Sequence, residues 1–322
     1  MSLYLSPHTV AVTDAVRAAE ATGLPVNVIT IAEAVGSDIT NVVRSCVEEN
    51  RFGAAAHVLS SYLSSDVPVA VSDYTRRLII ESAAAIDARH GTRFAMQCAE
   101  RVDISYPAID TTEFLDPHPT VVEATLAQRG LRTGEYVLFL SRLARAKGVD
   151  DLIDGFAASE QCTGLRLVVA GNGPEARVLQ EYAAASSAAD RIIFLDDVTD
   201  AERSALMAGC AAFALPTKPM PEFTETFGIA LVEKMLSGGG PVITTETGGV
   251  GEAVGDTALI VPTDDPCAIA AALDTALLMP DSEREALALR ARDYAMQFDR
   301  VFVLDRLLRL VEQPSLAEIS AA

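Results

Sequence analysis

The 322-residue chain is 50% hydrophobic and 22% charged, a composition typical of globular proteins that excludes disordered, collagen-like and disulfide-framework chains. Its net charge of -20 argues against nucleic acid as a partner, because a protein that binds the phosphate backbone needs a basic surface. No run of about 18 apolar residues is present, so we expect no membrane span. Residues 1–8 lack the basic start of a secretory signal, and we therefore expect a cytoplasmic location.

In the first half of the chain, short apolar runs alternate with helical patterns. We expect strands over residues 3–5, 25–31, 67–72 and 102–105, and helices over residues 9–21, 38–63 and 75–88. This is an α/β pattern, but it supplies only about four strands. The segment 116–119 (Asp-Pro-His-Pro) is typical of an exit from a domain.

In the second half of the chain, apolar runs and helical patterns alternate more regularly. We expect strands over residues 136–140, 165–170, 191–195, 211–215, 242–245 and 258–261. Helices are predicted over residues 149–158, 174–185, 200–209, 227–236, 266–278 and 300–311. Apolar strands that alternate with helices indicate a parallel sheet covered on both faces, so residues 135–280 are predicted to form one doubly wound α/β domain.

The numbers and spacing of cysteine and lysine limit the kinds of site that the chain can contain. The five cysteines form no CxxC pair and no cluster with histidine, which argues against a zinc site or a disulfide framework and favours buried thiols in a reducing compartment: Cys46, Cys98, Cys162, Cys210 and Cys267. Only three of the 25 basic residues are lysines (Lys147, Lys218 and Lys234), so a lysine inside a motif is more informative than usual.

Two carboxylates frame the most informative segment, Glu225-Thr-Phe-Gly-Ile-Ala-Leu-Val-Glu233. Gly228 is expected at a tight entry to a helix, with Glu225 in the loop before it and Glu233 about two turns inside. The amino-terminal amides of such a helix can hold a phosphate, and the two carboxylates can accept hydrogen bonds from hydroxyls. On spacing alone, an ordinary amino-terminal charge and a solvated helix residue remain the favoured interpretation.

Two further segments follow strands. Arg142 and Lys147 leave the carboxyl end of a strand, the edge where open α/β sheets bind ligands, and two cations there suit a diphosphate. Gly171-Asn172-Gly173-Pro174 is a turn at the end of the next strand, and it lacks the GxGxxG pattern of dinucleotide sites. Each segment alone is also typical of a plain surface turn.

Taken in order, SRLxxxKG, AGNGPE, ETFGxxxxE and TGG resemble the carboxyl-terminal half of the retaining, nucleotide-sugar-dependent glycosyltransferases of family four, which have the GT-B fold. Residues 69–76 resemble the family's AVSxxTR junction, and residues 105–114 resemble its link into the second domain. The resemblance implies two Rossmann-like, doubly wound domains. On this resemblance, residues 1–125 are expected to form a partial acceptor-side domain, residues 126–297 the nucleotide-sugar donor domain, and residues 298–322 a helix that packs back on the first domain.

The resemblance also implies roles. Arg142 and Lys147 grip the donor diphosphate, Glu225 bonds sugar hydroxyls, and Glu233 holds the ribose. The remaining donor-binding positions are Gly171, Asn172, Val198 (which contacts the base through its main chain), Thr226, Phe227, Gly228 and Ile229. Arg142, Lys147 and Glu225 are the expected catalytic residues. We expect no metal and no cofactor, because the two cations neutralise the phosphate that leaves. The expected partners are the donor and a small-molecule or lipid-linked hydroxyl acceptor.

The first half departs from the family. The family's Gly-rich loop after the first strand has no counterpart, and the segment ending in Ala32-Glu33 lacks the family's histidine. His8 lies near a strand end, although a lone histidine is more often structural. The amino-terminal domain is therefore predicted to be reduced or incomplete, or completed by a partner chain or a second copy. Two alternatives stay open: a donor-binding module that is inactive alone, and a nucleotide-sugar epimerase, which the scarcity of histidine disfavours.

Overall fold

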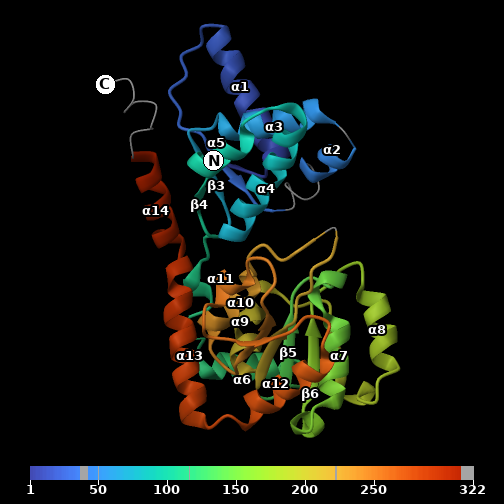
Figure 1. Cartoon of the computed structure of the whole chain (residues 1–322). Helices are drawn as coiled ribbons and strands as arrows, with labels where there is room; N and C mark the ends of the chain where they lie inside the picture. Colours follow the sequence, from blue (N-terminus) through green and yellow to red (C-terminus); the bar gives the residue numbers. More distant parts are fainter. Residues whose placement is uncertain (37–42, 50, 116, 222, 313–322) are drawn as a thin grey trace. The chain divides into compact units, whose positions relative to one another are not determined.

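The computed structural model describes residues 1–36, 43–49, 51–115, 117–221 and 223–312. The chain forms two compact units, one of residues 1–108 and 300–322 and one of residues 109–299. Each unit is built around a parallel sheet, as the alternating pattern predicts (Figure 1). Among the described residues, no helix combines the length and the apolar character that crossing a membrane requires.

The first unit has a four-stranded sheet of order β1-β2-β3-β4. Its elements in chain order are β1 (Ser2–Leu3), η1 (Leu5–Thr9), α1 (Val10–Ala21), β2 (Ile31–Ala34), α2 (Arg44–Glu48), α3 (Phe52–Leu63), β3 (Val67–Ala70), α4 (Asp73–His90), α5 (Phe94–Arg101), β4 (Asp103–Ile104) and α14 (Arg300–Glu312). Four strands were expected, and four are present.

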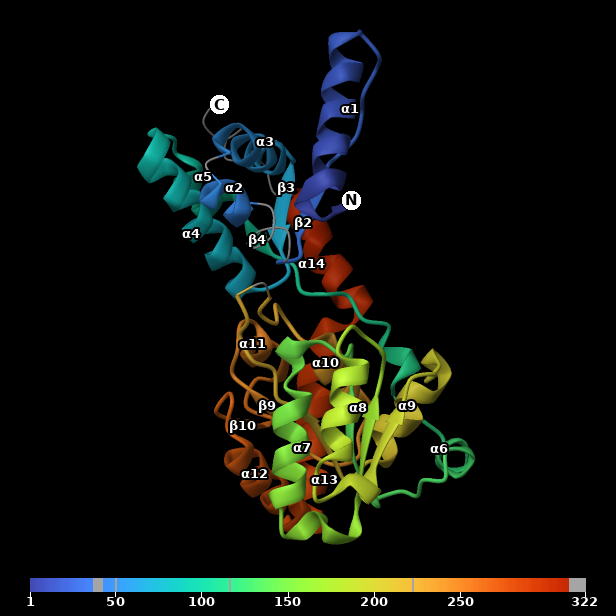
Figure 2. The same ribbon diagram turned by 90° about the vertical axis from the view of Figure 1, so that its right-hand side faces the viewer.

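Strand alternation gives this sheet two different faces. Ala32, Ala34 and Ala70 belong to the main core, which α3, α4 and α5 complete. Val67 and Val69 face the other way and pack against Leu307 of α14. The closing helix thus lies against the sheet of the first unit, and Figure 2 shows it behind the strands.

One strand of the first unit was predicted in the wrong place. The apolar run over residues 25–31 has no regular structure up to Thr30, and β2 begins at Ile31. Val28 and Ile29 are more than half exposed, at 58% and 57%. Pairing with β3 selects the later segment, since Ile31 aligns with Val67 and Ala34 with Ala70. The helix predicted over residues 38–63 is α2 and α3 where the structure describes it, and residues 37–42 and 50 lie outside the described residues.

The second unit has a six-stranded parallel sheet of order β10-β9-β8-β5-β6-β7. Its elements are η3 (Thr111–Glu113), α6 (Pro119–Gln128), β5 (Tyr136–Leu140), η4 (Arg145–Lys147), α7 (Val149–Ala158), η5 (Gln161–Gly164), β6 (Arg166–Ala170), α8 (Ala176–Ala184), η6 (Ala189–Arg191), β7 (Ile192–Leu195), α9 (Asp200–Gly209), β8 (Ala212–Leu215), α10 (Ile229–Ser237), β9 (Val242–Thr245), α11 (Val250–Val254), β10 (Leu259–Val261), α12 (Pro266–Leu278), α13 (Asp281–Ala295) and η7 (Met296–Phe298).

All six predicted strands of this unit are present, and helices cover both faces of its sheet. Helices α7, α8 and α12 lie on one side, and α6, α9, α10 and α13 on the other (Figures 1 and 2). The unit begins at Ile109 rather than at the expected residue 126, because α6 packs against α9 and belongs to this fold. Helices α6, α11 and α13 were not predicted.

Candidate functional site

The strand order places a topological switch point between β5 and β8. From β5 the chain continues outward to β6 and β7, and from β8 it continues in the opposite direction to β9 and β10. Ligands of open α/β sheets bind outside the carboxyl ends of the strands at such a point. The loops that follow β5 and β8 therefore form the candidate site, and they contain Arg142, Lys147 and Glu225.

These two loops are held together through a glycine. Gly148 has φ of +66°, and a Cβ built on it would lie 2.0 Å from the carbonyl oxygen of Pro216. Nearby, the Lys218 N–H donates to the Ala146 carbonyl at 2.9 Å. Only glycine fits at position 148, because it tolerates the left-handed backbone and allows this close approach.

The centre of the site is an ion pair between Lys147 and Glu225. Their side chains are 11% and 10% exposed, so the pair is sheltered from water. The Lys147 ammonium also lies 5.5 Å from the centre of the Phe223 ring, in cation–π range. Glu225 is thus a buried, paired carboxylate and not the ordinary amino-terminal charge that spacing alone favoured.

A second pair of glycines fixes the backbone of Glu225. The Gly249 N–H donates to the Glu225 carbonyl at 2.9 Å, and Gly248 has φ of +58°. A Cβ on Gly248 would lie 2.0 Å from the same carbonyl oxygen. The Gly248-Gly249 pair of the sequence motif therefore has a definite physical task, which is to hold the loop before α10.

The Gly171–Pro174 turn is packed against the loop after β5. A Cβ on Gly171 would lie 2.1 Å from the Ser141 carbonyl oxygen, and one on Gly173 would lie 2.2 Å from that of Leu143. The Leu143 N–H donates to the Asn172 carbonyl at 2.9 Å. The Asn172 side chain accepts from the N–H of Gly173 at 2.7 Å, so this turn shapes the loop that carries Arg142.

Helix α10 begins at Ile229, directly after Gly228 in the left-handed region at φ +101°. This confirms the predicted tight entry. Because the helix starts two residues later than expected, Glu233 lies about one turn inside it rather than two. The first residue, Ile229, is 47% exposed, whereas Phe227 is buried and makes an edge-on contact with Phe298. Thr226, which precedes Phe227 in the sequence, is half-buried.

Glu233 is buried and pairs with Arg203 of α9. Burial raises the pKa of the Glu233 carboxyl, and the Arg203 guanidinium opposes this shift. The guanidinium also lies 5.8 Å from the centre of the Phe114 ring. The interpretation of Glu233 as a solvated helix residue, which spacing alone favoured, is therefore wrong. No local pattern in the sequence points to Arg203 as its partner.

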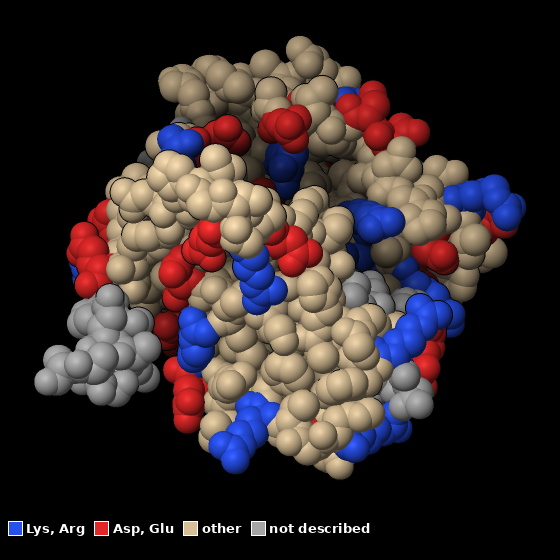
Figure 3. Space-filling view, turned by 90° about the horizontal axis from the view of Figure 1, so that it is seen from above, with Lys and Arg blue, Asp and Glu red and all other residues tan. Residues whose placement is uncertain are grey.

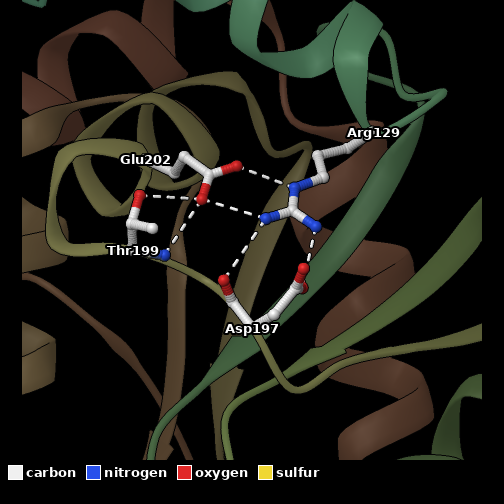
Figure 4. A network of polar contacts seen from close by, with 4 residues as sticks. All are labelled: Arg129, Asp197, Thr199 and Glu202. Atoms are coloured by element: carbon white, nitrogen blue, oxygen red, sulfur yellow. Dashed lines mark hydrogen bonds and ion pairs between the residues drawn. The ribbon is translucent and has the colours of Figure 1, made fainter.

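Val198 lies in the loop between β7 and α9, at the same edge of the sheet. The residues on either side of it are bonded into a network with Arg129 and Glu202 (Figure 4). The capping box of Thr199 and Glu202 is readable in the sequence as a T-x-x-E pattern. Arg129 carries no such signal, since it is 73 residues away from Glu202 along the chain.

Arg142 is exposed, and its side chain has no polar partner in the described part of the chain. It is therefore available to a ligand. The other two lysines are engaged elsewhere: Lys218 pairs with Asp150, Asp151 and Asp264, and Lys234 donates to the carbonyls of Gly238 and Gly240. On the face drawn in Figure 3, basic and acidic side chains are interspersed among the described residues.

Four of the five cysteines are buried free thiols as expected, but Cys267 is exposed, because it lies at the start of α12. Within the described ranges, no group of three or more His, Cys, Asp or Glu side chains is arranged to hold a metal ion. The site as built consists of one paired cation, one available cation, two buried carboxylates and a helix amino terminus. Such a set can bind a phosphorylated, hydroxyl-rich ligand.

Known proteins resemble the chain in this same region. Residues 123–294 match the family described as glycosyl transferases group 1. The D-inositol 3-phosphate glycosyltransferase of Salinispora tropica is 30% identical over 226 residues, which is 65% of this chain and 44% of that protein. The phosphatidyl-myo-inositol mannosyltransferase of Mycolicibacterium smegmatis is 26% identical over 255 residues, covering 78% of this chain and 58% of that one.

Solved structures agree on the fold. HepE of Anabaena, crystallised with UDP and glucose, aligns with a TM-score of 0.71 at 21% identity, covering 94% of this chain and 76% of that one. OtsA, a trehalose-6-phosphate synthase, aligns with a TM-score of 0.65 at 12% identity, covering 95% and 77%. The fold is GT-B, and the chain spans less than half the length of the first curated relatives that it matches. Because the family match covers more than half of the sequence, the chain belongs to the group 1 glycosyltransferases.

Proposed function

We propose that the protein is a retaining glycosyltransferase that moves a hexose-type sugar from a nucleotide diphosphate donor to a hydroxyl acceptor. The observation that carries this proposal is the sheltered Lys147–Glu225 pair at the switch point, next to the available cation of Arg142. In this arrangement a diphosphate and a sugar can be recognised side by side. The names of the relatives, which include a D-inositol 3-phosphate glycosyltransferase and a phosphatidyl-myo-inositol mannosyltransferase, support the same class of reaction.

The donor diphosphate is held by Arg142 and Lys147. Arginine offers a planar fork to phosphate oxygens, and lysine acts as a point charge. When a donor binds, the Lys147 ammonium also contacts the phosphate, and Glu225 accepts hydrogen bonds from sugar hydroxyls. Two cations that neutralise the departing phosphate make the transfer independent of a metal ion in this proposal.

The nucleoside is held at the other two places of the site. Glu233 accepts from the ribose hydroxyls, and the main chain of Val198 meets the base. The backbone from Thr226 to Ile229, with the turn at Gly171 and Asn172, lines the sugar and phosphates. These contacts position the donor, and positioning together with charge stabilisation supplies most of the rate.

In the reaction, the bond between the anomeric carbon and the phosphate oxygen breaks while the bond to the acceptor oxygen forms on the same face. The acceptor proton passes to the departing phosphate oxygen, so that the nucleotide diphosphate leaves carrying it. The configuration at the anomeric carbon is retained. We further propose a cytoplasmic location, a small-molecule or lipid-linked acceptor, and completion of the acceptor side by a partner chain or a second copy.

A second candidate function is a donor-binding module that does not transfer sugar alone. It is favoured by the position of the family match, which lies over residues 123–294 and contains Arg142, Lys147, Glu225 and Glu233. The two candidates differ in turnover, since both bind a nucleotide diphosphate and only the first releases it from a donor.

The test combines binding and turnover. Calorimetry with UDP and GDP, followed by a screen of sugar nucleotides read by mass spectrometry, should show binding and nucleotide release. Lys147→Ala and Glu225→Gln should each lower turnover by about 100-fold, the usual effect of removing one charge-stabilising group. Arg145→Ala, an exposed arginine of the same loop, is the matched control. Unchanged turnover in both site variants, or no nucleotide binding at millimolar concentration, would contradict the proposal.

A further inference from the structure

Arg129 follows helix α6 and holds the loop between β7 and α9 (Figure 4). Its Nε donates to Glu202 Oε1 at 2.7 Å, and its Nη2 donates to Oε2 of the same carboxylate at 3.0 Å. Its Nη1 donates to Asp197 Oδ1 at 2.8 Å. A two-point contact between arginine and a carboxylate fixes both distance and orientation, which a single ion pair does not.

The Glu202 carboxylate, which Arg129 holds in place, in turn restrains Thr199 through hydrogen bonds. Oε2 of Glu202 accepts from the Thr199 N–H at 2.9 Å and from its hydroxyl at 2.8 Å. Bonds from Arg129 and Thr199 lower the pKa of Glu202 to about 2, so this carboxylate is charged throughout the physiological range. Arg129 and Glu202 are only 19% and 16% exposed, whereas the Asp197 side chain is 67% exposed. The bond to Glu202 is therefore the stronger of the two restraints.

Val198 lies between the two residues that this network holds. It is half-buried, and neither its N–H nor its carbonyl has a hydrogen-bond partner within the described residues. Backbone groups that are not fully exposed are nearly always paired with protein or water. Val198 thus offers one backbone donor and one backbone acceptor on a loop whose flanking residues are held by this network.

We propose that Arg129 is the positioning residue for nucleobase selection: by fixing Asp197 and Thr199 it holds the N–H and carbonyl of Val198 in the register that one base can meet. This inference rests on the proposed function, and it concerns the recognition of the base and not the chemistry of transfer. A nucleobase offers donors and acceptors at set spacing along its edge, so a loop that shifts loses its preference. The diphosphate, which is held at Arg142 and Lys147, does not depend on this loop.

The test measures base preference directly. Calorimetry on the full chain compares UDP, GDP and inorganic pyrophosphate as probes, for the unmodified protein and for Arg129→Gln. The variant should bind the preferred nucleotide about tenfold more weakly, equivalent to about 1.4 kcal/mol, and its preference between UDP and GDP should fall by a similar factor. Pyrophosphate affinity should stay within about twofold, since no base is present.

Controls separate this role from general stabilisation. Arg132→Gln removes a nearby arginine whose side chain is 82% exposed, and it should change neither affinity nor preference. Arg129→Lys keeps the charge but not the two-point contact, and it should be intermediate. Asp197→Ala changes an exposed side chain without removing the buried bonds, and a drop in preference of about threefold is expected even where Arg129→Gln folds poorly.

The outcomes are distinct. Weaker binding of the preferred nucleotide with unchanged pyrophosphate binding supports the inference. Unaltered preference in both Arg129→Gln and Asp197→Ala, equal affinity of the unmodified protein for UDP and GDP, or a parallel loss of pyrophosphate binding overturns it while the proposed function stands. Failure of the unmodified protein to bind either nucleotide overturns the proposed function together with this inference.

Discussion

Gly248→Ala tests whether the backbone of Glu225 is what organises the site. Gly248 lies in the left-handed region at φ +58°, and its Cβ position is 2.0 Å from the Glu225 carbonyl oxygen and 2.9 Å from the Thr224 methyl carbon. Ordinary contacts of a Cβ begin near 3.4 Å, so an added methyl group must move the Glu225 backbone by about 1 Å or more. The carboxylate that pairs with Lys147 moves with it.

The magnitude has two parts. A non-glycine residue in the left-handed region costs about 1 kcal/mol, and forcing a methyl group into a packed site costs about 1 to 3 kcal/mol more. We therefore expect Gly248→Ala to lower the free energy of unfolding by about 3 kcal/mol in total. A displacement of about 1 Å in a positioning group costs about 100-fold in turnover, which we expect for nucleotide release from the donor.

Gly134→Ala is the matched control. Gly134 lies in the same unit with φ of +77°, and its Cβ position meets nothing within 4 Å. It should show the backbone cost of about 1 kcal/mol alone, without loss of turnover. Urea unfolding gives the stability of both variants, and donor turnover gives the second readout. Equal stability of the two variants together with full activity of Gly248→Ala would refute the reasoning.

Three further predictions concern buried charges. Arg203→Ala leaves the buried Glu233 carboxylate without its partner, and it should lower the free energy of unfolding in urea by about 2 kcal/mol at pH 8. The loss should be smaller at pH 5, where the carboxyl can be protonated. The exposed Arg177→Ala should cost under about 1 kcal/mol, and equal losses in the two variants would contradict this prediction. The pKa of Glu202 is lowered from 4.5 to about 2, so its contribution of about 2 to 3 kcal/mol to stability is present above pH 4.5 and is lost as the pH falls toward 2. The difference in unfolding free energy between the unmodified protein and Glu202→Gln should therefore shrink in acid. A difference that stays constant with pH would contradict this prediction. Glu33 is buried on the face of β2 that it shares with Ile31, and burial raises its pKa from 4.5 to about 7. The folded state therefore holds this proton more tightly, stability is lost as pH rises from 4.5 through 7, and Glu33→Gln should stabilise the protein by about 2 to 3 kcal/mol at pH 8 and little at pH 5, unlike the exposed Glu81→Gln; a gain independent of pH would be evidence against it.

The doubly wound unit was predictable because its inner strands, β5, β6, β8 and β9, are buried along nearly their whole length. Residues 136–140 and 242–245 are continuous apolar or β-branched runs, and both strands end where the prediction placed them. Helix α13 was not predicted, because its sequence, with seven charged residues among fifteen, shows no clear apolar stripe. In the first unit, β2 was misplaced since the more apolar run is the exposed one, and pairing with β3 chose Ile31–Ala34.

The motif order by itself indicated the family. It also singled out Arg142, Lys147, Glu225 and Glu233 as candidate site residues. Only the tertiary structure decided how these groups are paired. Lys147 meets Glu225 across 78 residues, Arg203 meets Glu233 across 30, and Arg129 meets Glu202 across 73. Local patterns along a sequence report hydrogen bonds and periodicity within one element, whereas a partner brought in by the sheet order leaves no mark on its neighbours in the chain.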